Sequence, residues 1–276
     1  MFVPDWICDT VLGPIQATGC AIERLAVGAE LLPTVLPAPA VDELLILVDP
    51  FALGHPTIQA CAHLGPRLLV DLTQALYRTP PHGCWGIASA RKFLGVPDGA
   101  FVWGPKPLPH PVFANERVRA EHLAARAEGT PEALALYRQN ESALSTDYLA
   151  PALLSDDLLD RIDHANVQRR RSANATVLHT RLKGHNQLEL PEDLPADAVP
   201  MAYPFLPATP VPHSALYAEQ IWAPRLWPER CEDGLPFTRH LSQHLLPLPC
   251  DQRYTADHMH HIADVVLRAL TGSAGG

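Results

Sequence analysis

Short, almost wholly apolar runs bounded by turn residues recur in the first hundred residues of the chain. Residues 43–49 (ELLILVD) and 67–71 (RLLVD) each predict a strand buried on both faces, because they lack the alternation of a half-exposed strand. Two more strands are predicted over residues 85–89 and 100–103, and a short helix over residues 55–64. Strands that alternate with helices predict an α/β protein with a largely parallel sheet.

The pattern becomes helical after Pro111. Ser155, followed by two aspartates, predicts a helix start, and the helical pattern continues to Gly184. One long or bent helix of about 28 residues is therefore expected, a length typical of a helix that bridges two domains. A proline-rich stretch over residues 191–212 follows it.

The C-terminal end is also predicted to be helical. Thr255 caps this helix and Gly272 ends it. Its apolar stripe consists of Met259, Ile262, Ala263, Val266 and Leu270. Together these patterns predict a large sheet domain over residues 1–155, and the bridging helix with a smaller domain over residues 156–276.

Composition and charge exclude several classes of function. The 276 residues are 47% hydrophobic and 18% charged, which is typical of a globular protein. A formal charge of -9 argues against binding to nucleic acid or to an anionic membrane surface, because both require clustered cations. The first basic residue is Arg24, and no apolar stretch approaches the roughly 18 residues of a membrane span. We therefore expect no secretory signal, no membrane span and a cytoplasmic location.

Metal and nucleotide motifs are weak in this sequence. Six scattered cysteines form no C-x-x-C pair, which favours reduced thiols over a disulfide framework or a zinc site. Two histidine pairs have helical spacing but no carboxylate companions, so we interpret them as solvated or capping residues and predict no metal; they are His240 with His244 and His258 with His261. Neither a P-loop nor a G-x-G-x-x-G motif occurs.

Lysine is rare in this chain, since only three of the 21 basic residues are lysines. An amine can lose its proton and attack a carbonyl, whereas a guanidinium effectively cannot, so a retained lysine is a candidate for chemistry. Lys106, within GPKPLP, and Lys183, beside Gly184 at a helix end, have adequate structural explanations. Lys92 is the remaining candidate.

Lys92 follows the strand that comes after the one ending in Asp71. Because ligands of α/β sheets bind at the carboxyl ends of strands, the two residues are expected to converge on one ligand. Pyridoxal 5′-phosphate (PLP) needs this pair: a lysine amine for the Schiff base and an aspartate that keeps the pyridine nitrogen protonated. The Ser89 hydroxyl suits the phosphate, and the Gln74 amide suits the ring oxygen. An exposed turn lysine and a turn-capping aspartate are the alternatives.

Five blocks of sequence carry a resemblance to a known family: VPDWICDTVLGPIQATG, LLVDLTQAL, SARKFLGVPDGA, RRRSANATVL and LPCDQRYTADHMHHI. In this order, over nearly the whole chain, they resemble the fold-type-I PLP-dependent aminotransferases, most closely the DegT/StrS-type branch associated with nucleotide-sugar amination. The resemblance implies a three-layer α/β sheet domain of the aspartate aminotransferase-like type, with a smaller C-terminal α+β domain.

The same resemblance implies roles for individual residues. Lys92 would form the Schiff base, Asp71 would pair with the pyridine nitrogen, Gln74 would lie near the ring hydroxyl and Ser89 would bind the phosphate. It also implies an aminotransferase that takes an amino donor and a keto acceptor such as a keto sugar, working as a homodimer with its site at the subunit interface. Asp251 and Arg253 match a family block without an assigned role.

The chain also departs from the family pattern. It opens on the strand that usually follows a phosphate-binding helix start, and we therefore expect it to be shortened at the N-terminus. The position of a ring-stacking aromatic falls at Cys8, with Trp6 nearby as a substitute. Three interpretations stay open: a partner chain completes the pocket, the enzyme binds its cofactor weakly, or the chain is a non-catalytic relative.

Ser89-x-x-Lys92 also matches the nucleophile motif of penicillin-recognising hydrolases. Those enzymes place the motif at the start of a helix and have a later Lys-Thr-Gly strand. Here Gly95 and Pro97 interrupt a helix within one turn, and Lys-Thr-Gly occurs nowhere in the sequence. The pattern therefore favours the PLP interpretation.

Overall fold

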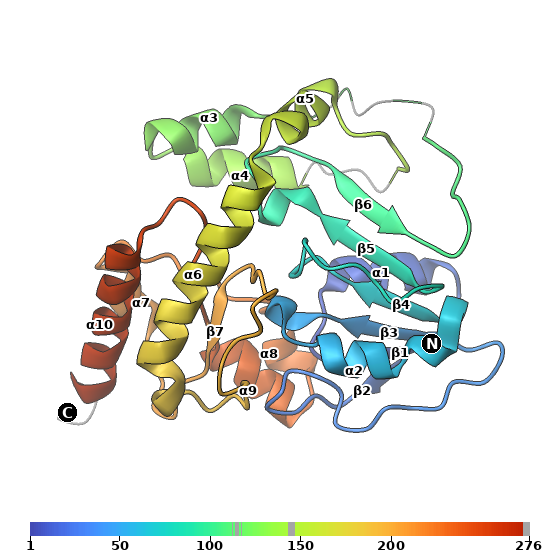
Figure 1. Ribbon diagram of the computed structural model, residues 1–276, viewed down its shortest axis with the longest axis horizontal. Helices are drawn as coiled ribbons and strands as arrows, with labels where there is room; N and C mark the ends of the chain where they lie inside the picture. Colours follow the sequence, from blue (N-terminus) through green and yellow to red (C-terminus); the bar gives the residue numbers. More distant parts are fainter. Residues whose placement is uncertain (112, 114–115, 117, 143–146, 273–276) are drawn as a thin grey trace.

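A six-stranded sheet forms the centre of the larger part of the molecule (Figure 1). The structure is a computed structural model, and it describes residues 1–111, 113, 116, 118–142 and 147–272. Its strand order is β2-β1-β3-β4-β5-β6, and every neighbouring pair is parallel except β5 with β6. The strands are β1 (Phe2–Pro4), β2 (Glu23–Leu25), β3 (Leu45–Val48), β4 (Leu68–Asp71), β5 (Trp85–Ser89) and β6 (Ala100–Trp103). The four strands predicted from the sequence, and the α/β class, are confirmed.

The central strand β3 is buried on both faces, which explains why its sequence does not alternate. Leu45 and Leu47 pack in one hydrophobic cluster with Ile58 of α2. Ile46 and Val48 pack in another cluster, which contains Leu12 of α1. The sheet is therefore covered by a helix on each face. These two helices are α1 (Asp9–Ala17) and α2 (His55–Ala60).

Two helical predictions need correction. The helix predicted over residues 55–64 ends at Ala60 and is followed by a 3₁₀ turn, Ala62–Arg67, in which Gly65 has φ +54°. The single long helix predicted from Ser155 to Gly184 is wrong, because the chain forms two helices there. They are α5 (Leu153–Arg161) and α6 (His164–Leu182).

Local capping explains the break between α5 and α6. The Asp163 side chain accepts a hydrogen bond from the Asn166 backbone N–H at 2.9 Å, which starts a new helix. Ser155, predicted as a helix start, instead lies inside α5, where its hydroxyl donates to the Asp98 carboxylate. A capping aspartate inside an otherwise helical pattern therefore ended the run that the periodicity predicted.

A second, two-stranded antiparallel sheet lies beside the C-terminal helices, and it consists of β7 (Tyr203–Phe205) and β8 (Leu246–Leu248). The final helix buries Met259, Ile262, Ala263 and Val266 of the predicted apolar stripe, whereas Leu270 is half-buried; the predicted end at Gly272 coincides with the last described residue and stays a prediction. None of the described helices is long and apolar enough to cross a membrane. The final helix is α10 (Ala256–Gly272). The remaining helices are α3 (Glu121–Glu128), α4 (Ala133–Ser142), α7 (His213–Tyr217), α8 (Arg230–Asp233) and α9 (Pro236–His244).

Helix α6 belongs to two hydrophobic cores. Val167, near its start, packs in the cluster formed by the large sheet. Ala175, Leu178 and Leu182, further along, pack in the cluster of the small sheet and α10. Figure 1 shows α6 as the long helix that runs diagonally down the molecule, with α10 on one side of it and β7 and the large sheet on the other. Helix α6 therefore packs in both cores, while its predicted role as a bridge between two domains, with a boundary at residue 155, stays a prediction.

Replacing Leu178 by alanine should destabilise the protein by about 3 kcal/mol, because a fully buried side chain leaves a cavity when it is truncated. Thr180→Ala, at an exposed position of the same helix, should change the free energy of unfolding by less than about 0.5 kcal/mol. Urea denaturation of both variants measures the difference. Equal stabilities would contradict the packing described for α6.

Candidate functional site

Acidic and polar residues gather at one edge of the large sheet, where the parallel strands end. Asp49 directly follows β3, Asp71 is the last residue of β4, and Ser89 is the last residue of β5. The Asp49 backbone N–H donates to the Asp71 carbonyl at 2.9 Å, so the first two strand ends are direct neighbours. Both aspartates are buried. This carboxyl edge is where ligands of open α/β sheets bind, and it is therefore the candidate site.

Thr73 connects the predicted aspartate with the predicted lysine. Asp71 Oδ1 accepts a hydrogen bond from the Thr73 backbone N–H at 2.8 Å, and Lys92 Nζ donates to Thr73 Oγ1 at 3.1 Å. Asp71 is buried, whereas Lys92 is exposed. The structure thus brings Asp71 and Lys92 to the same turn, with the amine open to solvent. Thr73 was missed in the sequence, although it stands only two residues beyond Asp71.

A short 3₁₀ turn, Ala90–Lys92, presents the lysine after β5. The Ala90 N–H donates to the Gly99 carbonyl at 3.1 Å, and Gly99 has φ +107°, a conformation that favours glycine. Ser89 precedes the turn, is half-buried and makes no side-chain hydrogen bond within the described part of the chain. Ser89 therefore directly precedes a tight turn that ends at Lys92, while the roles predicted for both residues toward a cofactor stay predictions.

Gln74 lies at the same edge and is almost fully buried. Its Oε1 accepts a hydrogen bond from the Phe51 backbone N–H at 3.2 Å. Phe51 and Ala52 have φ values of +53° and +61°, which are costly for residues other than glycine. The Gln74 amide oxygen thus stabilises a strained turn after β3, and its predicted place near a ring hydroxyl stays a prediction.

Asp49 is a second buried acid of this edge. Burial raises the pKa of Asp49 to about 6, against the lowering effect of a hydrogen bond from the Gly54 N–H. That bond, at 2.8 Å, involves Oδ1, while Oδ2 is buried without a partner among the described residues. Asp49 could have been found in the sequence as the acid that ends the apolar run 43–49. Its raised pKa could not, because it depends on burial that only the fold creates.

The two candidates for a ring-stacking side chain lie differently. Trp6 is 2% exposed and packs its ring against Trp227, with centroids 4.4 Å apart, and against Phe51. This burial in the protein core argues against Trp6 as a stacking substitute. Cys8 is half-buried and directly precedes α1.

Asp251 and Arg253 form an ion pair at 2.8 Å, and Asp251 Oδ1 also accepts the Arg253 backbone N–H. The pair therefore shapes the loop between β8 and α10, a role that sequence comparison alone did not assign. Gln252 lies between them, and its side-chain amide donates to the Phe93 carbonyl at 2.9 Å.

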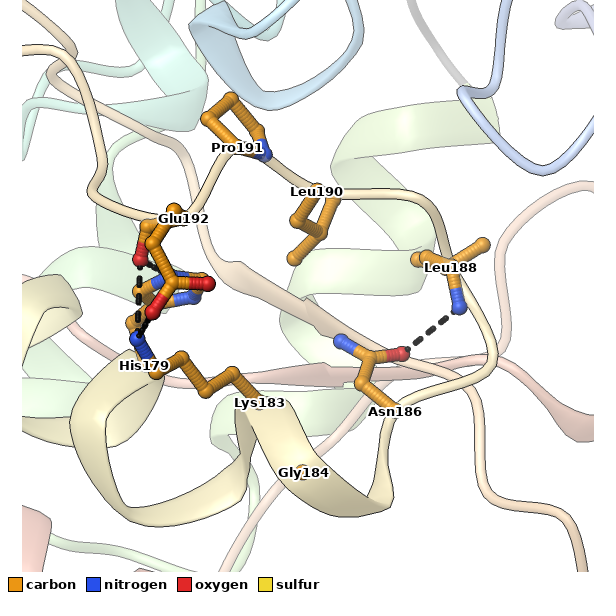
Figure 2. A pocket seen from close by; sticks show the side chains of 8 residues that line it. All are labelled: His179, Lys183, Gly184, Asn186, Leu188, Leu190, Pro191 and Glu192. Carbon is orange, nitrogen blue, oxygen red and sulfur yellow. Dashed lines mark hydrogen bonds and ion pairs between the residues drawn. The ribbon is translucent and has the colours of Figure 1, made fainter.

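Lys183 belongs to a different region. Its Nζ donates to the Glu192 carbonyl at 3.1 Å and pairs with the Glu192 carboxylate, and His179 Nε2 lies 3.0 Å from the same carbonyl. Figure 2 shows these side chains at one end of a cavity of about 250 Å³. Its lining comes from the end of α6 and the segment that follows, not from the sheet edge. The engaged amine agrees with a structural role for Lys183.

No group of His, Cys, Asp or Glu able to hold a metal occurs among the described residues.

Comparison with known proteins finds solved structures that share the fold of this chain. No protein-family model and no curated protein matches the chain. Among solved structures, PseC of Helicobacter pylori, an aminotransferase involved in the biosynthesis of pseudoaminic acid, is 12% identical with a TM-score of 0.66, and the match covers 98% of this chain and 79% of PseC. A DegT/DnrJ/EryC1/StrS aminotransferase from Brucella abortus is 15% identical with a TM-score of 0.60, covering 100% and 79%.

A third structure with this fold is not an aminotransferase. GDP-4-keto-6-deoxy-D-mannose-3-dehydratase of E. coli, solved with bound hydrated PLP, is 12% identical with a TM-score of 0.62, covering 96% of this chain and 79% of the enzyme. The chain therefore has the fold of the PLP-dependent sugar aminotransferases and related dehydratases. This confirms the fold predicted from the DegT/StrS-type resemblance.

The raised pKa of Asp49 predicts a pH-dependent loss of stability. Between the ordinary value of 3.8 and about 6 the folded chain retains a proton that the unfolded chain releases, so stability falls as the pH rises through this window. The difference corresponds to about 3 kcal/mol. Asp49→Asn should remove this loss. Urea denaturation at pH 4 and pH 7 measures it, and wild-type and variant curves with the same pH slope would contradict it.

Proposed function

We propose that this chain is a PLP-dependent aminotransferase that passes an amino group from a small-molecule donor to a keto substrate such as a keto sugar. The single observation that carries the proposal is the contact of Lys92 Nζ with Thr73 Oγ1, which brings the amine to the turn that begins at Asp71. The fold shared with PLP-dependent sugar aminotransferases supports the same assignment. A homodimer, expected from the resemblance, stays a prediction.

The residues at the sheet edge fit the two reactive ends of PLP. When bound, PLP supplies an aldehyde that condenses with an amine and a protonated pyridine ring that withdraws electrons. Lys92 is an exposed amine, as covalent attachment to the aldehyde requires. Asp71 is a buried carboxylate at a strand end, as a partner for the pyridine nitrogen requires.

Each residue then has a separate task. Lys92 would hold the cofactor covalently and, once released by the amino donor, would carry a proton to and from the reacting carbon. Asp71 would hold the proton on the pyridine nitrogen. Thr73 orients the Lys92 amine through its hydroxyl. Ser89 would donate its hydroxyl to the phosphate group.

Lys92→Ala should abolish covalent PLP binding. The wild type, incubated with PLP and reduced with borohydride, should carry the cofactor mass on the peptide that contains Lys92, and it should show the visible absorption band of a bound cofactor before reduction. Lys106→Ala, which removes another of the three lysines, is the matched control and should leave both signals intact. Absence of an adduct at Lys92 in the wild type would overturn the proposal.

Thr73→Val should slow the attachment of PLP to Lys92 by about fivefold, because one hydrogen bond of about 1 kcal/mol no longer orients the amine. Thr73→Ser keeps the hydroxyl and should retain close to the wild-type rate. Stopped-flow absorbance with saturating PLP gives these rates. A valine variant as fast as the serine variant would remove Thr73 from the site.

The alternative is a PLP-fold protein that is non-catalytic or depends on a partner chain. It is distinguished by what the isolated protein does after it has bound PLP. Amine transfer from glutamate to a keto sugar by the isolated chain excludes this alternative. Transfer that appears only after co-purification with a second protein supports a site completed by that partner.

A further inference from the structure

The carbonyl of Phe93, the residue directly after Lys92, is held by two side chains that are distant in the sequence. Arg171 Nη2 donates to this oxygen at 3.0 Å, and Gln252 Nε2 donates to it at 2.9 Å. Arg171 belongs to α6, and Gln252 lies in the loop between β8 and α10. A carbonyl oxygen has two lone pairs, and both donors therefore fit on it.

Arg171 is a buried cation whose donors are directed to neutral oxygens. It is 2% exposed, and burial lowers its pKa. Its Nε donates to Gln252 Oε1 at 2.8 Å, and its Nη1 donates to the carbonyls of Pro200 and Met201 at 3.1 and 3.0 Å. Within the described part of the chain no carboxylate forms an ion pair with it. A buried charge is costly unless it is well hydrogen-bonded, so the geometry of these carbonyls is tightly constrained.

The guanidinium also contacts the Phe93 ring, with its central carbon 4.6 Å from the ring centroid. Arg171 therefore holds Phe93 from two sides, by its carbonyl and by its ring. The turn that carries Lys92 ends at this residue, since the Phe93 N–H donates back to the Ala90 carbonyl. A shift of Phe93 would move the base of the lysine side chain directly.

We propose that Arg171 and Gln252 are positioning residues for Lys92. They hold the Phe93 carbonyl and thereby set where the lysine amine meets Thr73, and they couple this turn to α6 and to the loop that precedes α10. The inference rests on the proposed function of Lys92. Arg171 and Gln252 thus change the reactivity of the Lys92 amine although neither touches the reacting atoms.

The chain offers a matched control on the same helix. Arg170 Nη2 donates to the Tyr254 carbonyl at 3.0 Å, so it also joins α6 to this loop, but no described contact links it to Phe93. The test uses Gln252→Leu and Arg171→Lys against Arg170→Gln. Gln252→Leu keeps the buried guanidinium and keeps the proposal testable if Arg171→Lys fails to fold.

The first measurement needs no cofactor. Amide hydrogen exchange over residues 90–96 should become about tenfold faster in Gln252→Leu and Arg171→Lys and stay unchanged in Arg170→Gln. In the same proteins, trace acetylation of Lys92, read by mass spectrometry relative to Lys106, should rise about threefold when the turn loosens and Thr73 no longer engages the amine. Unchanged hydrogen exchange and unchanged Lys92 acetylation in both Gln252→Leu and Arg171→Lys would overturn the inference.

The second measurement follows the borohydride-trapped PLP adduct. Its rate of formation at Lys92 should fall about fivefold in Gln252→Leu and remain at the wild-type value in Arg170→Gln. If the wild type forms no adduct, the proposed function fails, while exchange and acetylation still decide the positioning role. If exchange rises but acetylation and adduct rate do not change, Arg171 and Gln252 are structural only, and the positioning role is refuted.

Discussion

Burial of the sheet on both faces is the constraint on which the site depends. A strand such as β3 has no solvent-facing side, so its polar side chains are restricted to its ends. Since the strands are parallel, their carboxyl ends meet at one edge, and Asp49, Asp71 and Ser89 are placed there together. The same packing that stabilises the fold therefore gathers the candidate chemistry in one place.

Two aspartates at neighbouring strand ends acquire different properties from their surroundings. Asp49 has one carboxylate oxygen buried without a partner among the described residues, and burial raises its pKa. Asp71 directs an oxygen to the backbone N–H of Thr73 and thereby shapes the turn that receives Lys92. The turn-forming role considered for Asp71 and its proposed role toward a cofactor are thus compatible, because the turn is what brings the lysine close.

The sequence predicted the elements that depend on local pattern and missed those that depend on distant contacts. Apolar runs located four strands, and the scarcity of lysine led to Lys92. The predicted single helix failed because Asp163 caps a new helix inside a continuous helical pattern. Arg171 and Gln252 lie in two of the blocks that carry the family resemblance, but their contact with Phe93 was not predicted, because Gln252 reaches a carbonyl 159 residues away and such a partner becomes visible only after folding.

Helix α6 has a consequence for how the protein unfolds. Its unbroken 19 residues contribute side chains to the core of the large sheet and to the core of the small sheet. If either core unfolds, the apolar side chains that α6 contributes to it become exposed, and α6 is also part of the other core. The unfolding equilibria of the two cores are therefore linked. The two sheets are thus expected to melt in one cooperative transition, and a proteolytic cut within α6 would leave neither fragment with a complete interior.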